Sequence, residues 1–281
     1  MLMRLLVLLI GLWPARWALW FGERLGHLAF ALGVRRQVAL ENLALAFPEK
    51  PEADRRALCR AHYAHLGRAA IEFFRAGESL ARVDAGEWEV LASAHAQGKG
   101  LIACVAHLGN FELFAAYGAK RGLPLTVVTR QLHGAFNRGW LALRGGLGVR
   151  ELRGRNVIAG MLQVLRERGV LAVVIDQNMR PSRAVFTPLF GKLAATTPAP
   201  AVLAERTGAP VVLGALVRQA DGTFRVRFQG PFTSRGDALT GELNRALEGM
   251  IRANPEQWFW VHRRWKTRPE GEQMTDVVTA R

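Results

Sequence analysis

Cysteine is nearly absent from this 281-residue sequence, in which only Cys59 and Cys104 occur, far apart. Neither belongs to a Cys-x-x-Cys pair of the kind that holds zinc, and two cysteines are too few for the disulfide framework of a small secreted protein. Cys104 lies inside an apolar segment, where a thiol is normally inert packing and not a nucleophile. His62 and His65 share a helical spacing, but no third ligand lies nearby in sequence. We therefore expect a reducing compartment, no metal site and no cofactor.

Acidic residues are also scarce, since 23 Asp and Glu face 38 Lys and Arg, which leaves a formal net charge of +15 and a pI near 11.3. This balance predicts an anionic partner: a membrane surface, a phosphorylated lipid, an acidic protein or nucleic acid. Half of the residues are hydrophobic, which excludes disorder as the default and is enough for a sizeable core.

A long uninterrupted apolar run is missing too. The first 34 residues are rich in Leu, Trp and Ala, but Pro14, Arg16 and Glu23 interrupt them before the roughly 20 apolar residues of a spanning helix are reached. A signal peptide is one alternative, although no small-residue cleavage site follows the run. A buried N-terminal helix is another. We expect residues 1–34 to form an uncleaved membrane anchor, as a short span or a pair of interfacial helices.

Repeats and low-complexity tracts are absent, and residues 35–281 are predicted to form one domain. A helix is expected over 51–77, followed by a buried strand over 100–106. Strands and helices then alternate, with helices predicted at 110–121, 156–168 and 198–207, strands at 124–129 and 170–175, and a pair of strands at 211–217 and 224–228. This order predicts an α/β fold: a mostly parallel central sheet flanked by helices, with an antiparallel addition near its C-terminal end.

The segment from Ala106 to Glu112 contains the most informative chemistry. His107 directly follows a predicted buried strand, at the carboxyl edge of the sheet where open α/β folds bind ligands. Glu112 falls in the first turn of the next helix, near enough to turn back and orient the imidazole as a general base. The alternative is that His107 packs at the strand end and Glu112 only suits the helix dipole. Free amides at the helix start are candidates for holding an oxyanion or a phosphate.

Four stretches of the chain resemble the bacterial lipid A late acyltransferases, the lauroyl and myristoyl transferases within the wider glycerolipid acyltransferase superfamily. They are His107 and Glu112 separated by four residues, Asn42-Leu43 with Phe47-Pro48, Asp176-Gln177 followed by residues 186–191, and the Trp-rich stretch 255–269. The last stretch is the most specific of the four. The resemblance runs from about residue 35 to residue 269.

This resemblance implies an acyltransferase in which His107 is the general base and Glu112 its orienting partner. It also implies substrate-binding roles for Asn110, Arg130, Arg144, Asp176 and Gln177, with Arg144 in a Gly-flanked turn that departs from the family pattern. The implied donor is an acyl carrier protein thioester, and the implied acceptor is a phosphorylated glycolipid, the lipid A precursor. The implied location is the cytoplasmic face of the bacterial inner membrane.

Two other functions stay open at this point. The same fold acts on other acceptors, such as a lysophospholipid, a mannosylated phosphatidylinositol or an aminolipid. A non-catalytic basic protein that binds membrane or nucleic acid is the alternative from another class, because Trp258, Trp260 and Trp265 lie among basic residues. The intact pair of His107 and Glu112 argues against it, and for the tryptophans we expect a core and membrane-facing role and no nucleic-acid partner.

Overall fold

A seven-stranded sheet forms the centre of the protein, in a computed structural model that describes residues 2–129, 134–154 and 157–269. Its strand order is β1-β9-β8-β2-β5-β3-β4, and every neighbouring pair is parallel except β8 and β9. The strands are β1 (Val83–Asp84), β2 (Leu101–Gly109), β3 (Leu125–Val128), β4 (Arg150–Leu152), β5 (Val170–Val174), β8 (Val211–Arg218) and β9 (Phe224–Phe232). The predicted α/β fold with a mostly parallel sheet and an antiparallel addition is confirmed.

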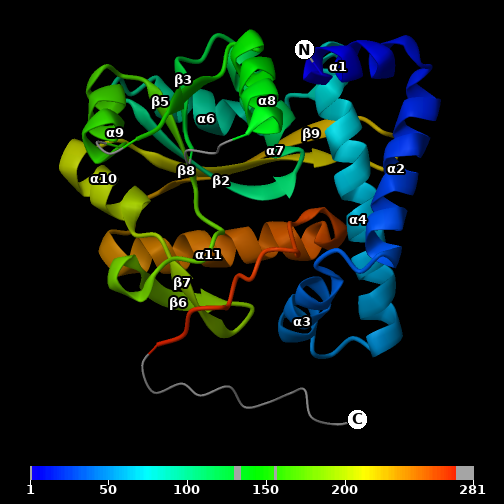
Figure 1. Ribbon diagram of the computed structural model, residues 1–281. Helices are drawn as coiled ribbons and strands as arrows, with labels where there is room; N and C mark the ends of the chain where they lie inside the picture. The colour runs from blue at the N-terminus through cyan, green and yellow to red at the C-terminus, as the bar shows by residue number, and fades with distance from the viewer. Residues whose placement is uncertain (1, 130–133, 155–156, 270–281) are drawn as a thin grey trace.

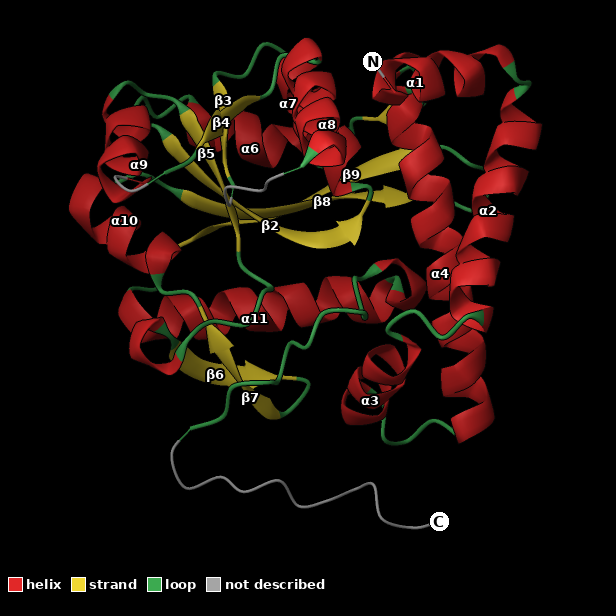
Figure 2. Ribbon diagram, in the orientation of Figure 1, coloured by secondary structure: helices red, strands yellow, loops and turns green. Residues whose placement is uncertain are grey.

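Helices cover both faces of this sheet (Figure 2). The helices are α1 (Leu2–Leu12), α2 (Ala15–Ala31), α3 (Arg36–Ala46), α4 (Glu52–Phe74), α5 (Ala76–Leu80), α6 (Trp88–His95), α7 (Phe111–Lys120), α8 (Ala135–Gly146), α9 (Val157–Arg166), α10 (Ala199–Thr207) and α11 (Gly236–Ala253). One core cluster joins α6 and α7 to the sheet, and a larger one joins α9, α10 and α11 to its other face. Strands buried on both faces explain why the apolar runs at 101–106 and 170–175 are continuous and do not alternate.

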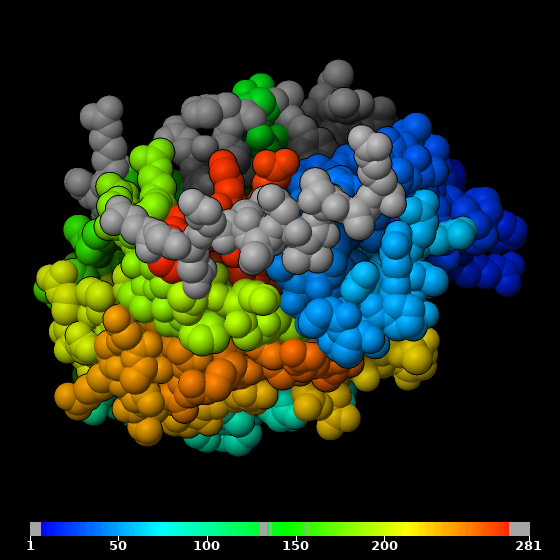
Figure 3. All heavy atoms as spheres, turned by 90° about the horizontal axis from the view of Figure 1, so that it is seen from below, coloured from blue at the N-terminus to red at the C-terminus, as the bar shows by residue number. Residues whose placement is uncertain are grey.

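A hairpin of β6 (Val185–Leu189) and β7 (Lys192–Thr196) packs beside α11 outside the main sheet. Figure 3 shows the hairpin and α11 side by side on the lower face of the molecule, next to α3 and α4. Two short 3₁₀ helices, η1 (Pro181–Arg183) and η2 (Pro255–Gln257), complete the elements. The sequence patterns did not predict this hairpin, because its strands are short and only partly buried.

The predicted elements agree with the structure in type, but several bounds differ. The helix expected over 51–77 begins after Pro51 and breaks at Arg75, where α4 gives way to α5. The strand expected to end at Ala106 continues to Gly109, so His107 lies inside β2 and not after it. Gly208 ends α10 in the left-handed conformation, with φ at 69°, as expected for a glycine at a helix C-terminus.

The N-terminal helices lie against one side of the molecule (Figure 1), where α2 packs on α4 through glycines. A Cβ at Gly26 would meet the carbonyl oxygen of Tyr63 at 2.0 Å, and one at Gly67 would meet that of Gly22 at 1.9 Å, so both backbones approach too closely for any side chain. Among the described residues no helix has both the length and the apolarity to cross a membrane.

Candidate active site

The last residues of β2 present His107 at the carboxyl edge of the sheet. The register of β2 against β8 shifts between Val105 and Gly109, and this irregularity bends the strand at the histidine. Gly109 has a φ of 65°, and a Cβ there would meet the carbonyl oxygen of Leu216 at 2.0 Å. Only glycine therefore fits at this position.

Asp176 orients His107. Its Oδ1 lies 2.9 Å from His107 Nδ1, and its Oδ2 accepts hydrogen bonds at 2.8 Å from the His107 backbone N–H and at 2.8 Å from the Trp258 indole. An ionised carboxylate accepts only, so Nδ1 carries the proton and Nε2 is left as an acceptor. The two residues meet because β2 and β5 pair in register at Val105 and Val174, which puts position 107 level with position 176.

The charges of this pair reinforce one another. Burial alone lowers the pKa of the His107 imidazole, but the charge and hydrogen bond of Asp176, with the charge of Glu112, outweigh burial and raise that pKa above its usual value. Burial alone raises the pKa of the Asp176 carboxyl, but His107 and Trp258 outweigh it and hold that pKa below its usual value. Asp176 is therefore ionised at neutral pH and favours a protonated imidazole beside it.

Glu112 makes its hydrogen bonds with α8 and not with His107. Trp140 Nε1 donates to its Oε1 at 2.8 Å, and the Arg144 guanidinium binds both carboxylate oxygens, with Nε at 2.6 Å from Oε2. The hydrogen bond that orients the imidazole, expected from Glu112, comes from Asp176 instead. Glu112 still lies close enough to contribute to the raised pKa of His107.

The remaining predicted substrate-binding residues fall in different places. Arg144 lies in α8 and not in a turn, despite its glycine neighbours. Asn110 is buried: its side chain caps α7 by accepting from Leu113 N at 3.2 Å, and donates to Ala69 O and to Glu72. Those bonds join α7 to α4, so a substrate contact would have to displace them. Arg130 lies outside the described residues.

Gln177 follows Asp176 and lines the same cavity as His107. Its Nε2 lies 3.4 Å from His107 Nε2, on the side of the ring that faces away from Asp176. The amide is therefore next to the nitrogen that would exchange a proton with a substrate.

Aromatic side chains hold the site together, and two of them, Phe111 and Phe259, were given no role by the sequence patterns. The Phe111 ring meets the His107 ring edge-on, with 4.8 Å between the two ring centroids. The centroid of the Phe259 ring lies 5.6 Å from that of His107. The tryptophans at 258, 260 and 265 were expected to face the core and the membrane, but all three are buried, and only the core half of that expectation holds. The Trp-rich stretch gave the only sequence signal for this support.

The two histidines of α4 are buried and neutral, because burial lowers the pKa of His62 to about 3 and that of His65 to about 4. His65 Nε2 contacts the carbonyl oxygen of Gly109 at 3.2 Å, which supports the turn that follows His107. Across the described residues, no three His, Cys, Asp or Glu side chains cluster as metal ligands do.

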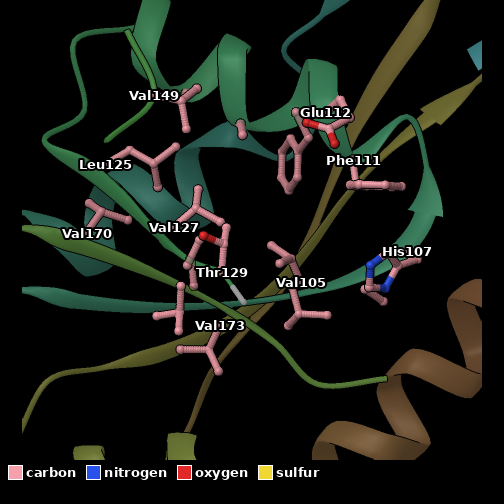
Figure 4. A pocket seen from close by; sticks show the side chains of 18 of the residues that line it. Val105, His107, Phe111, Glu112, Leu125, Val127, Thr129, Val149, Val170 and Val173 are labelled. Atoms are coloured by element: carbon pink, nitrogen blue, oxygen red, sulfur yellow. The ribbon is translucent and has the colours of Figure 1, made fainter. Parts of the chain in front are cut away.

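A cavity of about 780 Å³ extends from His107 and Glu112 into the protein, between the sheet and α7 (Figure 4). Its wall is mostly aliphatic, and Figure 4 shows Leu125, Val149 and Val170 across the cavity from His107. Arg144, Thr129 and Gln177 are among its few polar lining residues. An apolar cavity with a few polar groups in its wall, among them His107, suits a ligand with a long hydrocarbon chain and a reactive polar end.

Comparison with known proteins agrees with this geometry. The family model described as bacterial lipid A biosynthesis acyltransferase matches residues 1–267. The chain belongs to this family. Similar proteins from Escherichia coli K12 include a lipid A biosynthesis lauroyltransferase, 30% identical, a palmitoleoyltransferase, 28% identical, and a myristoyltransferase, 28% identical. Each match covers 89% of this chain. The matches cover 85% of the lauroyltransferase, 85% of the palmitoleoyltransferase and 81% of the myristoyltransferase.

As a lipid A biosynthesis acyltransferase, the protein is an enzyme that transfers an acyl group, and the expected resemblance is confirmed. Acyl transfer to a hydroxyl needs a base for the hydroxyl proton, a place for the acyl chain and stabilisation of the charge on the carbonyl oxygen. The structure contains a candidate for the first two in one continuous site: the paired imidazole and the apolar cavity beside it.

Proposed function

We propose that the enzyme moves a fatty acyl chain from an acyl carrier protein thioester to a hydroxyl of a phosphorylated lipid A precursor. The observation that supports this most directly is the oriented His107 at the wall of an otherwise apolar cavity. In this proposal the acyl chain lies in the cavity with its thioester carbonyl next to His107, where the acceptor hydroxyl approaches from the carboxyl edge of the sheet.

The proposed reaction takes place in two steps. His107 Nε2 takes the proton of the acceptor hydroxyl as the oxygen attacks the thioester carbonyl, and Asp176 stabilises the imidazolium that forms. The tetrahedral intermediate then collapses, the C–S bond breaks, and the sulfur leaves as a thiol with the proton from the imidazolium. Glu112 contributes a second negative charge that favours the protonated ring, while Arg144 and Trp140 fix its position.

The start of α7 supplies candidates for oxyanion stabilisation. Within the described residues, the backbone N–H groups of Phe111 and Glu112 have no hydrogen-bond acceptor, as is usual for the first turn of a helix. Free amides at a helix N-terminus carry partial positive charge, which suits the oxygen of a tetrahedral intermediate. We assign them this role.

The membrane attachment that we propose uses α1 and α2 as interfacial helices. Leu12, Trp13, Trp17, Trp20 and Leu28 are all about half exposed or more. The guanidinium groups of Arg16 and Arg24 lie over the Trp17 and Trp20 rings, at 5.8 and 5.3 Å from the centroids. Aromatic and basic side chains together on one exposed apolar surface are typical of helices that lie at the headgroup level of a bilayer. The cytoplasmic face of the inner membrane is the proposed location.

The donor and acceptor are tested by a reconstituted transfer assay. Purified enzyme is given the acyl carrier protein thioester or the matching coenzyme A thioester, with a lipid A precursor or a lysophospholipid as acceptor, and products are identified by mass spectrometry. We expect transfer from the carrier protein to the lipid A precursor, with a Michaelis constant for donor that rises with ionic strength because the +15 surface attracts an acidic protein.

Competition separates the two donors, since coenzyme A is also anionic. Unacylated carrier protein should inhibit at low salt if it docks on the enzyme. Equal efficiency with the coenzyme thioester and no inhibition by the carrier protein would refute the donor assignment, and transfer to the lysophospholipid alone would refute the acceptor.

A further inference from the structure

A second hollow lies at the other edge of the sheet, away from His107. Its volume is about 370 Å³, and its lining residues are Gly98, Lys99, Arg166, Arg168, Arg206 and Thr207 above the apolar Leu162 and Leu165. These segments lead into β2, β5 and β8, three adjacent strands, so the hollow lies at their amino ends. His107 lies near the carboxyl end of β2. We call this hollow the basic recess.

Four positively charged side chains gather around the recess. The side chains of Lys99, Arg166, Arg168 and Arg206 are all exposed, and no carboxylate lines the recess with them. In the part of the chain that the structure describes, none of the four is in an ion pair. Four cations around one hollow repel one another, and an anion between them relieves that repulsion.

Glu167 and Glu205, the carboxylates nearest to these cations in sequence, make hydrogen bonds outside the recess. Glu167, the residue that follows α9, accepts a hydrogen bond from Gln163, and Glu205 accepts one from the backbone N–H of Gly236 at 3.0 Å. Neither lines the recess. Each keeps its negative charge, so the two offset part of the positive charge from outside the recess.

Helix dipoles account for only part of this charge. Arg166 ends α9 and Arg206 lies in the last turn of α10, where the partial negative charge of a helix C-terminus favours a cation. Two such termini supply about −1 elementary charge in total, against four cations. With Glu167 and Glu205 next to these arginines in sequence, the net excess around the recess is about one positive charge, and of these charged side chains the cations alone line it.

Arg168 adds an independent observation. It has a φ of 59°, the left-handed conformation that glycine adopts without steric cost and that arginine rarely adopts. Its backbone N–H closes the end of α9 on Leu165 O, a position where glycine is the usual residue. The chain thus has a guanidinium at the recess in a place where backbone geometry alone favours glycine.

We propose that the basic recess binds a soluble polyphosphate anion, of the size of pyrophosphate or a nucleoside diphosphate. A concave hollow of this volume admits a small anion, whereas a docked protein needs a broad surface of roughly 1,000 Å² or more. The exposed apolar helices α1 and α2 lie on the opposite side of the molecule from α9 and α10 (Figure 1), so a bilayer under α1 and α2 would not reach the recess. The ligand is therefore soluble and distinct from the lipid acceptor.

The experiment measures pyrophosphate binding to the full chain by isothermal titration calorimetry at low salt. Arg168→Gly is the decisive variant, because glycine suits the backbone at this position and the protein keeps its fold. We expect at least tenfold weaker binding in Arg168→Gly and in Arg166→Gln, with no change in acyl transfer at saturating substrates. Arg245→Gln, which removes an exposed arginine of α11 outside the recess, is the matched control and should bind as the wild type does.

Three results would overturn the proposal. The first is no heat of binding with millimolar pyrophosphate, or equal affinity in wild type, Arg168→Gly and Arg166→Gln. The second is that Arg168→Gly loses affinity for vesicles containing anionic lipid, which would make the recess a headgroup contact. The third is that the same variant raises the Michaelis constant for the carrier protein donor, which would make the recess a protein-docking surface.

Discussion

The carboxylate of Asp176 binds His107 twice, once through the ring nitrogen Nδ1 at 2.9 Å and once through the backbone N–H at 2.8 Å. A single side chain just after β5 therefore fixes the position, the tautomer and the charge preference of the histidine on β2. The Trp258 indole donates a further hydrogen bond to the same carboxylate, at Oδ2.

Replacing Asp176 with Asn should lower the turnover number by about 10²- to 10⁴-fold, the range for losing the oriented tautomer or the base itself. The acid limb of the pH–rate profile should also move. The negative charge of Asp176 raises the pKa of His107, so removing that charge lowers the pKa. Because a general base must be deprotonated to act, activity should then extend to lower pH. Asp237→Asn, at an exposed position of α11, is the control. An acid limb that stays in place would contradict the pairing.

Replacing His107 with Ala should reduce acyl transfer by at least ~10²-fold while the protein stays folded. Circular dichroism and the melting temperature report the fold, and product mass spectrometry reports the transfer. Near-normal turnover would exclude His107 as the general base.

The pair of Glu112 and Arg144 should behave as a unit. Glu112→Gln removes the carboxylate that holds a largely buried guanidinium, so we expect it to lose both activity and stability. In the double variant Glu112→Gln/Arg144→Met neither member of the pair is left charged, and Glu151, which also binds Arg144, keeps Arg153 as a partner at 3.3 Å. The loss in free energy of unfolding of the double variant should therefore be smaller than the sum of the two single losses. Additive losses, measured by urea denaturation, would show that the two side chains act independently.

Gly118 should set part of the space for the acyl chain. It lies in α7 at the cavity wall, and a Cβ there would reach Leu125 at 3.4 Å and Leu123 at 3.5 Å, so a small side chain fits. Gly118→Ala should therefore shift the preferred donor towards a shorter chain, as measured by competition between carrier-protein thioesters of different lengths. Gly249→Ala, in open space on α11, is the control and should leave the preference unchanged.

Vesicle binding should depend on the exposed tryptophans of α2. Trp17→Ser/Trp20→Ser should weaken sedimentation with anionic vesicles, because about half of each ring is exposed and available to the headgroup layer. Point variants test this better than deletion of the N-terminus, since α2 is packed on α4 through Gly22, Gly26 and Gly67. The control is Ile158→Ser, an exposed apolar residue of α9. Unchanged sedimentation of the tryptophan variant would place attachment elsewhere.

The sequence by itself determined the alternation of strands and helices, and it singled out His107 at a strand end next to a helix start. Those features are local: a continuous apolar run marks a strand buried on both faces, and Gly109 and Asn110 mark the turn and the cap after it. The family resemblance followed from the same motifs together with the Trp-rich stretch near the C-terminus.

Only the tertiary structure decided which carboxylate serves His107. Glu112 is five residues away in sequence, but the α7 backbone directs it toward α8, where Arg144 and Trp140 bind it. Asp176 is 69 residues away, yet the in-register parallel pairing of β2 with β5 brings it level with the histidine. Strand order and register are long-range properties, set by how the sheet and its helices pack together, and no spacing along a single chain specifies them.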